Sequence, residues 1–259
     1  MSGDLLVALA DGVARVTLNR PHARNALTFA MYQRLGEACT AAAADPAIRV
    51  MVITGAGDKA FAAGTDIAEF RQFQTAADAL AYEERIEAIL SGLERLRMPV
   101  IAAIAGACTG GGAAIAAACD LRIATRDARF GFPIARTLGN CLSIRNLARL
   151  SSLVGPARVK DMLLTARLVD AQEAQAIGLV HEVVEDHAAL AARVEALAAT
   201  IGGHAPLTIR ATKEALYRLQ AEAAAPSDAD LVTLCYMSED FREGMEAFLA
   251  KRPPFWRGR

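Results

Sequence analysis

Hydrophobic residues alternate with polar ones at the start of the chain and then recur at helical spacing. The runs Leu5–Leu9 and Val13–Leu18 flank Asp11-Gly12, a pair typical of the two-residue turn of a β-hairpin. Thr28 then precedes an amphipathic run that stops at Asp45-Pro46. The pattern therefore predicts a hairpin followed by a helix.

Short apolar strands alternate with helices after this point. Val50–Thr54 and Val100–Ile104 are strand-like, and the helical stretch Ala77–Arg97 connects them in a βαβ pattern. The second half is rich in helix-forming residues, and we expect helices over 186–201, 206–222 and 228–251. The sequence thus predicts an α/β body over residues 1–195 and a helical C-terminal region over residues 196–259.

One uncharged segment, Met98–Cys119, is long enough to cross a bilayer. Pro99 and the run Gly110-Gly111-Gly112 interrupt it, however, so we expect a buried strand followed by a helix and no membrane partner. The N-terminal residues, with Asp4 and Asp11, do not resemble a signal peptide.

Composition narrows the class of protein. Of the 259 residues, 54% are hydrophobic and 22% are charged, which is enough apolar surface for a large core. The net charge of -1 lacks the basic excess of nucleic-acid-binding proteins. The five cysteines are widely spaced and form no C-x-x-C pair, which predicts neither a disulfide framework nor a metal site and favours a cytoplasmic location.

Two glycine-containing loops are the main candidates for a functional site, because G-x-S-x-G, H-E-x-x-H and phosphate-loop motifs are missing from the sequence. Gly110-Gly111-Gly112 follows a strand and opens the helix Ala113–Ala118, where free backbone N–H groups suit an anion or a developing oxyanion. Close backbone packing is the alternative reason for these glycines. The loop Ala63-Gly64-Thr65-Asp66 follows another strand and offers one more N–H group.

Five motifs together resemble the crotonase family, also called the enoyl-CoA hydratase/isomerase family. They are Leu18-Asn19-Arg20-Pro21 with Asn25-Ala26-Leu27, Lys59 to Ile67, Pro99 to Gly106, Thr109-Gly110-Gly111-Gly112 with Cys119-Asp120, and Arg242-Glu243-Gly244-Met245 with Ala247-Phe248 and Lys251-Arg252. They occur in the family's order over nearly the whole chain.

The resemblance implies a crotonase-like spiral of ββα turns with a C-terminal helical trimerisation region, assembled as a trimer or a dimer of trimers. It implies an acyl-CoA thioester as substrate, whose carbonyl oxygen accepts hydrogen bonds from the Thr65 and Gly111 N–H groups. Coenzyme A enters as part of the substrate, and no permanently bound cofactor is expected. By motif position, the residues that approach the CoA moiety are Arg24, Ala26, Ala63, Asp66, Ile67 and Lys251.

The two glutamates of the family's hydratases are missing by the same alignment of motifs. Their positions are Ala114 and Ile134, and neither side chain can transfer a proton. The nearest polar candidates as replacements are Arg136, Asn140 and Cys141, while Asp66 and Glu69 lie on the first glycine loop and its helix. We expect Asp66 to cap that helix.

Three functions remain open at this point. The first is an acyl-CoA enzyme of the enoyl-CoA hydratase or isomerase type with weak or non-standard hydratase activity. The second is a decarboxylase or lyase for a malonyl-type thioester, in which Arg136 would hold the departing carboxylate. The third is a non-catalytic acyl-CoA-binding subunit.

Overall fold

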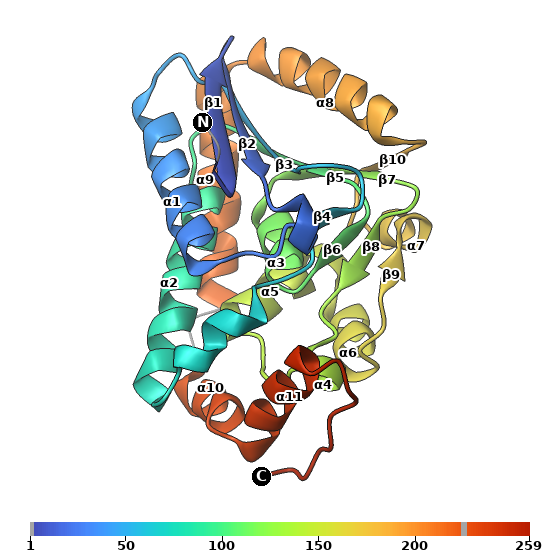
Figure 1. Cartoon of the computed structure of the whole chain (residues 1–259). Helices are drawn as coiled ribbons and strands as arrows, with labels where there is room; N and C mark the ends of the chain where they lie inside the picture. The colour runs from blue at the N-terminus through green and yellow to red at the C-terminus, as the bar shows by residue number, and fades with distance from the viewer. Residues whose placement is uncertain (1–2, 224–226) are drawn as a thin grey trace.

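Two sheets lie side by side in the body of the molecule, and each turn of the chain adds a strand to both (Figure 1). The computed structural model describes residues 3–223 and 227–259. The six-stranded sheet has the order β1-β2-β3-β5-β7-β10, formed by β1 (Leu5–Ala10), β2 (Val13–Leu18), β3 (Val50–Gly55), β5 (Val100–Ile104), β7 (Leu121–Thr125) and β10 (Glu182–Val184). The four-stranded sheet has the order β4-β6-β8-β9, formed by β4 (Ala60–Ala62), β6 (Ala107–Thr109), β8 (Arg129–Gly131) and β9 (Val169–Asp170).

Helices connect these strands and cover the sheets. They are η1 (Pro21–Ala23), α1 (Phe29–Ala44), η2 (Ile67–Gln72), α2 (Ala76–Glu94), α3 (Gly111–Ala118), α4 (Ile134–Thr137), α5 (Ile144–Val154), α6 (Pro156–Leu164), α7 (Ala171–Ala176), α8 (His187–Gly202), α9 (Pro206–Ala223), α10 (Ala229–Tyr236) and α11 (Glu239–Leu249). The order β3-β4-α2, β5-β6-α3 and β7-β8-α4 repeats one ββα unit three times. This repeat confirms the predicted spiral.

Local sequence signals account for the first elements. Asp11 and Gly12 have φ angles of 53° and 74°, which the hairpin turn between β1 and β2 requires. The Thr28 side chain accepts a hydrogen bond from the Met31 N–H and caps α1. Both predictions are confirmed.

The C-terminal part of the prediction needs one correction. In place of a single helix over 228–251, the chain forms α10 and α11 with a break at Met237. The Ser238 hydroxyl accepts a hydrogen bond from the Phe241 N–H and so begins a new helix, and the turn lets Phe241 pack into the core at 3% exposure.

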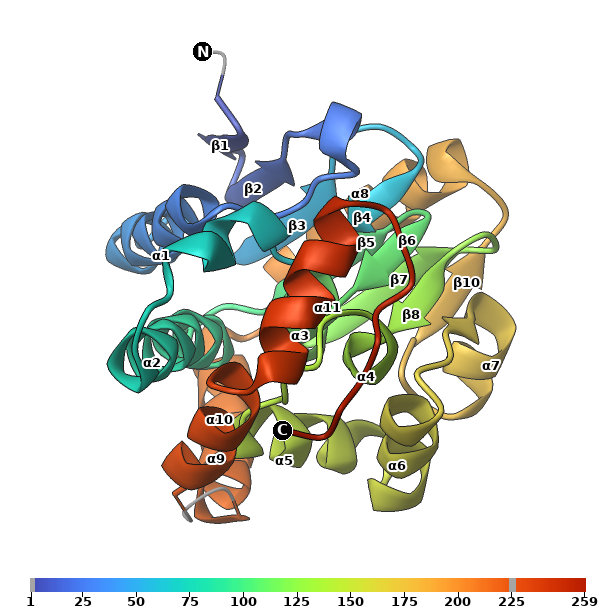
Figure 2. The same cartoon turned by 60° about the horizontal axis from the view of Figure 1, so that its bottom comes forward.

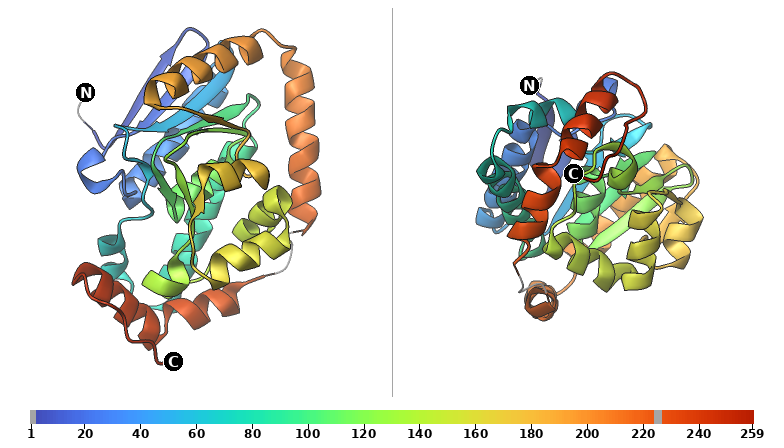
Figure 3. Two further views of the ribbon diagram at one scale, coloured as in Figure 1. Left: turned by 90° about the vertical axis from the view of Figure 1, so that its right-hand side faces the viewer. Right: turned by 90° about the horizontal axis from the view of Figure 1, so that it is seen from below.

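The helices after β10 take different positions around the body. α8 covers one face of the six-stranded sheet, where Leu190 and Ile201 belong to a buried cluster with Val52 and Ile101. The predicted boundary between residues 195 and 196 lies inside this continuous helix. α9 then runs along the edge of the molecule, and α10 and α11 return to pack on α2 and η2 (Figure 3).

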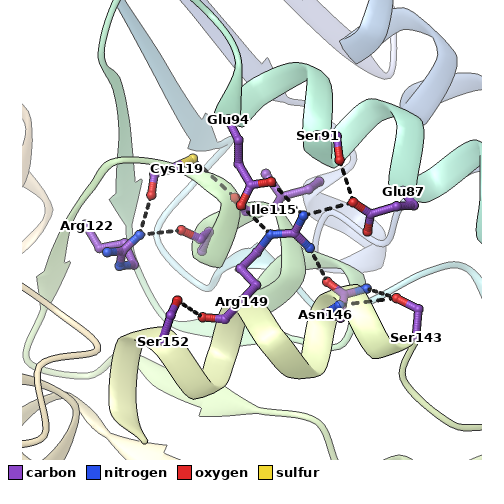
Figure 4. Close-up of polar contacts among 11 residues, drawn as sticks. Glu87, Ser91, Glu94, Ile115, Cys119, Arg122, Ser143, Asn146, Arg149 and Ser152 are labelled. Carbon is purple, nitrogen blue, oxygen red and sulfur yellow. Dashed lines mark hydrogen bonds and ion pairs between the residues drawn. The ribbon is translucent and has the colours of Figure 1, made fainter. Parts of the chain in front are cut away.

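A buried ion pair joins α2 to α5. Arg149 is 3% exposed and makes two hydrogen bonds to Glu94, at 2.7 and 2.8 Å, and one to Glu87 at 3.1 Å (Figure 4). Its remaining bond, to the Asn146 side chain, is 2.8 Å long. Because both carboxylates share this guanidinium, the pair fixes α5 against α2.

Two kinds of feature are missing from the part of the chain that the structure describes. None of its helices combines the length and apolar character that crossing a membrane requires. Within residues 3–223 and 227–259, no cluster of three or more His, Cys, Asp or Glu side chains is arranged to hold a metal ion.

Candidate active site

The two predicted loops leave the same edge of the four-stranded sheet. β4, β6 and β8 run parallel, so the segments after Ala62, Thr109 and Gly131 emerge side by side. Gly64 and Gly110 have φ angles of 112° and 51°, and a Cβ atom on Gly110 would lie 3.3 Å from the Gly64 Cα. The glycines therefore let the two loops touch, which also satisfies the packing explanation for them.

Hydrogen bonds hold the first loop against the segment before α1. The Leu27 N–H donates to the Gly64 carbonyl and the Asp66 N–H donates to the Leu27 carbonyl, each at 2.8 Å. These two hydrogen bonds leave the N–H group of the intervening residue, Thr65, pointing away from Leu27. Neither this group nor the Gly111 N–H, which begins α3, donates to an acceptor within residues 3–223 and 227–259. Two free donors thus lie on loops in direct contact.

A chain of three hydroxyl groups lies beside these donors. The Thr65 Oγ1 is 2.9 Å from the Tyr32 Oη and 3.1 Å from the Tyr82 Oη. A Cβ atom on Gly111 would lie 2.0 Å from the Tyr32 Oη and 3.0 Å from the Thr65 Oγ1. Burial raises the pKa of Tyr32 and of Tyr82, so both hydroxyls stay protonated at neutral pH.

The helices α2, α10 and α11 lie together on one side of the molecule (Figure 2). Aromatic rings from these helices, from α1 and from η2 pack against one another there. Tyr236 lies with its ring centroid 4.8 Å from that of Phe241 and 6.4 Å from that of Tyr82. The other rings in contact with this group are Phe29, Phe70 and Phe73. Two members of the hydroxyl chain, Tyr32 and Tyr82, are 1% and 8% exposed.

Ala114 and Ile134 occupy the positions that the resemblance assigns to the missing glutamates. Ala114 lies one turn into α3, where its N–H donates to the Gly110 carbonyl, and it is 5% exposed. Ile134 is the first residue of α4 and is partly buried. Since β6 and β8 are parallel neighbours, both side chains come from the sheet edge that carries the glycine loops.

The three polar candidates after Ile134 have different surroundings. Arg136 is exposed on α4, whereas Asn140 donates from Nδ2 to the Tyr236 Oη at 3.3 Å. The Asn140 Oδ1 is buried and has no hydrogen-bond partner among the described residues. Burial raises the pKa of the Cys141 thiol well above its usual range, so this sulfur is not a ready nucleophile.

Asp66 and Glu69 are held in structural contacts. The Asp66 carboxylate accepts a hydrogen bond from the Ala68 N–H, as expected of a cap, and lies 3.0 Å from the Arg20 Nη1. The Glu69 Oε2 accepts a hydrogen bond from the Phe29 N–H at 3.2 Å.

Most of the residues expected to approach CoA lie in segments that contact one another. The Ala63 N–H donates to the Arg24 carbonyl at 3.0 Å, and the Arg20 guanidinium, which pairs with Asp66, also donates to the Ala26 carbonyl at 2.7 Å. Arg24 and Ala63 are exposed, and Ile67 begins η2. Lys251 is exposed just after α11, the helix that packs on η2.

Sequence reasoning missed one carboxylate in this neighbourhood. Glu83, on α2, accepts a hydrogen bond from the Tyr236 Oη at 2.5 Å. Burial is the main cause that raises its pKa to about 7. No local motif marks Glu83, because it lies next to Glu84 in an ordinary amphipathic helix.

Comparison with known proteins agrees with this geometry. The sequence model of the enoyl-CoA hydratase/isomerase family matches residues 9–259. The chain belongs to this family. A crotonyl-CoA hydratase of Syntrophomonas wolfei is 37% identical over 252 residues, which are 96% of each chain.

Solved structures of the enoyl-CoA hydratase/isomerase family have the same fold. An enoyl-CoA hydratase/carnithine racemase from Magnetospirillum magneticum is 37% identical with a TM-score of 0.81, and the match covers 100% of this chain and 97% of the other. A methylmalonyl-CoA decarboxylase in complex with 2-nitronate-propionyl-CoA is 29% identical, with a TM-score of 0.90 over the full length of both chains. The crotonase-like fold is confirmed, and the chain is an acyl-CoA enzyme of this family.

Proposed function

We propose that this enzyme binds the thioester carbonyl oxygen of an acyl-CoA between the Thr65 and Gly111 N–H groups. The observation that carries the proposal is that two N–H groups without an acceptor among the described residues lie on loops that touch. A carbonyl oxygen placed between them would be polarised, and the charge of an enolate would be stabilised. Removal of one such donor lowers enzyme rates by about two to three orders of magnitude.

The proton chemistry differs from that of a two-glutamate hydratase. Neither Ala114 nor Ile134 can activate water or deliver a proton, and a general acid or base contributes about 10² to 10⁴ in rate. We therefore propose weak or non-standard hydration of an enoyl-CoA. Coenzyme A is part of the substrate, with Arg24, Ala26, Ala63, Asp66, Ile67 and Lys251 approaching it.

Titration calorimetry with acetyl-CoA and a longer acyl-CoA tests the binding step. We expect heat with at least one thioester and a weaker signal with free CoA, because free CoA lacks the thioester carbonyl group. The absence of heat with every thioester would contradict the proposal. Binding without any turnover would favour a non-catalytic subunit, and release of CO₂ from a malonyl-type thioester, lost in Arg136→Ala, would favour a decarboxylase.

We also propose that the protein associates with itself as a trimer or a dimer of trimers. The apolar side chains of the last two helices divide into two sets in the structure. Phe241, Met237 and Met245 pack on the chain's own core, whereas Leu231, Leu234 and Phe248 are 51%, 71% and 51% exposed. The exposed set is apolar surface that a neighbouring subunit would cover. Light scattering that shows a monomer at micromolar concentration would contradict this proposal.

The five cysteines, all free, support a reducing cytoplasmic location.

A further inference from the structure

Three side chains from separate parts of the chain meet at one hydroxyl group beside the aromatic cluster. Glu83 comes from α2, Tyr236 from α10, and Asn140 from the segment that follows α4. The Tyr236 Oη lies 2.5 Å from the Glu83 Oε1 and 3.3 Å from the Asn140 Nδ2. The tyrosine is 2% exposed, so the contacts form away from bulk water.

The polar cluster formed by Glu83, Tyr236 and Asn140 contains one acceptor atom that has no hydrogen-bond donor. The Asn140 Oδ1 is buried and unpaired within the described residues, although its Nδ2 is paired. A buried acceptor without a partner costs about 1–3 kcal/mol, and such groups normally bind an ordered water or a ligand. Because Asn140 and Glu83 both contact the Tyr236 hydroxyl, one water or substrate hydroxyl can reach the amide oxygen and the carboxylate together.

Two segments of the chain link this polar group to the neighbourhood of the proposed oxyanion site. Tyr82, the residue before Glu83, contacts the Thr65 Oγ1 at 3.1 Å. On the other side, Asn140 follows the short helix that Ile134 opens. Glu83 thus follows a tyrosine that contacts the Thr65 loop, and it shares the Tyr236 hydroxyl with Asn140.

We infer that Glu83, held by Tyr236, is the acid–base group of the acyl site, and that Asn140 holds the water or hydroxyl group with which Glu83 exchanges a proton. The inference rests on the proposed binding of an acyl-CoA at Thr65 and Gly111. Asn140 is a positioning residue in this scheme, and Tyr236 orients the carboxylate.

The electrostatic surroundings suit such a role. Burial holds the pKa of Glu83 at about 7, so both protonation states are populated at neutral pH. The nearby Glu87 is paired with Arg149. The ionisable groups that face Glu83 from α1, α2, α10 and the segment after α4 are Tyr32, Tyr82, Glu87, Asp228, Tyr236 and Cys141.

For an enoyl thioester, one carboxylate is enough to accept the proton from water and to return it to the substrate. The water oxygen bonds to C3 and one of its protons passes to Glu83. The C2=C3 electron pair becomes the C1=C2 bond of an enolate, and the carbonyl π pair moves onto the oxygen between Thr65 and Gly111. The enolate then takes that proton back from Glu83 at C2. The net change is the addition of one water, and the carboxylate is restored.

Deuterium exchange tests this inference without requiring knowledge of the natural acyl group. The full-length protein is incubated in D₂O with crotonyl-CoA and with 3-hydroxybutyryl-CoA, and mass spectrometry follows deuterium at C2. We expect Glu83→Gln to lower the exchange rate about 100-fold or more, with thioester affinity changed less than about threefold. Glu84→Gln, an exposed neighbour on the same helix, is the matched control and should exchange like the wild type.

The pH profile separates chemistry from a merely structural effect. The wild-type rate should rise with pH around a midpoint near 7, and Tyr236→Phe should move this midpoint upward, because the tyrosine hydroxyl lowers the pKa of the carboxyl. Tyr236→Phe is also a second variant with which the inference can be tested if Glu83→Gln does not fold.

The possible failures are distinguishable. If no thioester binds in the calorimeter, the proposed function itself is wrong. If thioesters bind normally, the inference is overturned by wild-type exchange in Glu83→Gln, by a Tyr236→Phe midpoint that does not move, or by the absence of exchange in the wild type.

Discussion

The Tyr32 hydroxyl lies 2.9 Å from the Thr65 Oγ1 and occupies the space into which a side chain at position 111 would extend. This contact joins α1 to the loop that carries the Thr65 N–H. It therefore connects the hydroxyl chain to both N–H groups proposed to bind the substrate carbonyl oxygen. It also explains why only glycine fits at position 111.

Gly111→Ala should weaken both folding and thioester binding. The new Cβ atom would lie 2.0 Å from the Tyr32 Oη, and overpacking of this kind costs about 1–3 kcal/mol. Tyr32→Phe removes the clashing oxygen, so Gly111→Ala with Tyr32→Phe should recover part of the loss. Urea unfolding and acyl-CoA calorimetry on the two single variants and the double variant measure this coupling, and strictly additive effects would argue against it.

Thr65→Val should destabilise the protein while keeping the backbone N–H at this position. Valine has nearly the same shape but leaves the buried Tyr32 and Tyr82 hydroxyls without their shared partner, at a cost of about 1–3 kcal/mol. Thr65→Ser keeps the hydroxyl and should lose less than half as much stability. Equal unfolding midpoints for the two variants would show that the hydroxyl chain contributes nothing to stability.

Wild-type protein should hydrate crotonyl-CoA orders of magnitude more slowly than a hydratase with both glutamates. Ala114→Glu with Ile134→Glu should raise the rate, because each acid can supply about 10² to 10⁴. Ala114→Gln with Ile134→Gln matches the added volume without the acid and should not. A spectrophotometric hydration assay compares them, and rapid wild-type turnover would show that the two glutamates are dispensable here.

Arg149→Met should lower the free energy of unfolding by about 3–5 kcal/mol. The substitution leaves the partly buried Glu94 and Glu87 without their cation, which is the costly way to break such an ion pair. Arg145→Met, at an exposed position of the same helix, should change stability by less than about 0.5 kcal/mol. Similar denaturation curves for the two variants would refute the importance of this ion pair.

Glu83 should make stability depend on pH in a defined direction. Because its pKa is raised from 4.5 to about 7 in the folded protein, its favourable contribution is complete below pH 4.5 and is lost as the pH rises through 7. Glu83→Gln should therefore gain stability relative to the wild type over this range, by up to about 3 kcal/mol. Unfolding free energies measured between pH 4.5 and 8 test the trend, and a difference between the two proteins that does not vary with pH would contradict the raised pKa of this carboxyl.

Local signals in the sequence were sufficient for the first hairpin, for the helix that follows it and for the two glycine loops. Asp11-Gly12 has the backbone freedom that the hairpin needs, and Thr28 carries a hydroxyl that caps the next helix. Such preferences act between residues close in the chain, so the sequence shows them. The family's motifs likewise indicate Thr65 and Gly111 from the sequence alone.

Only the tertiary structure decided which side chains meet around those loops. The pair Glu83 and Tyr236 is 153 residues apart in the chain, and Arg149 lies 55 residues from Glu94. No local pattern marks such residues, because burial and pairing arise when the sheets and helices pack together. The same packing broke the last predicted helix at Met237, left Arg136 exposed, and placed Asn140 in the polar cluster.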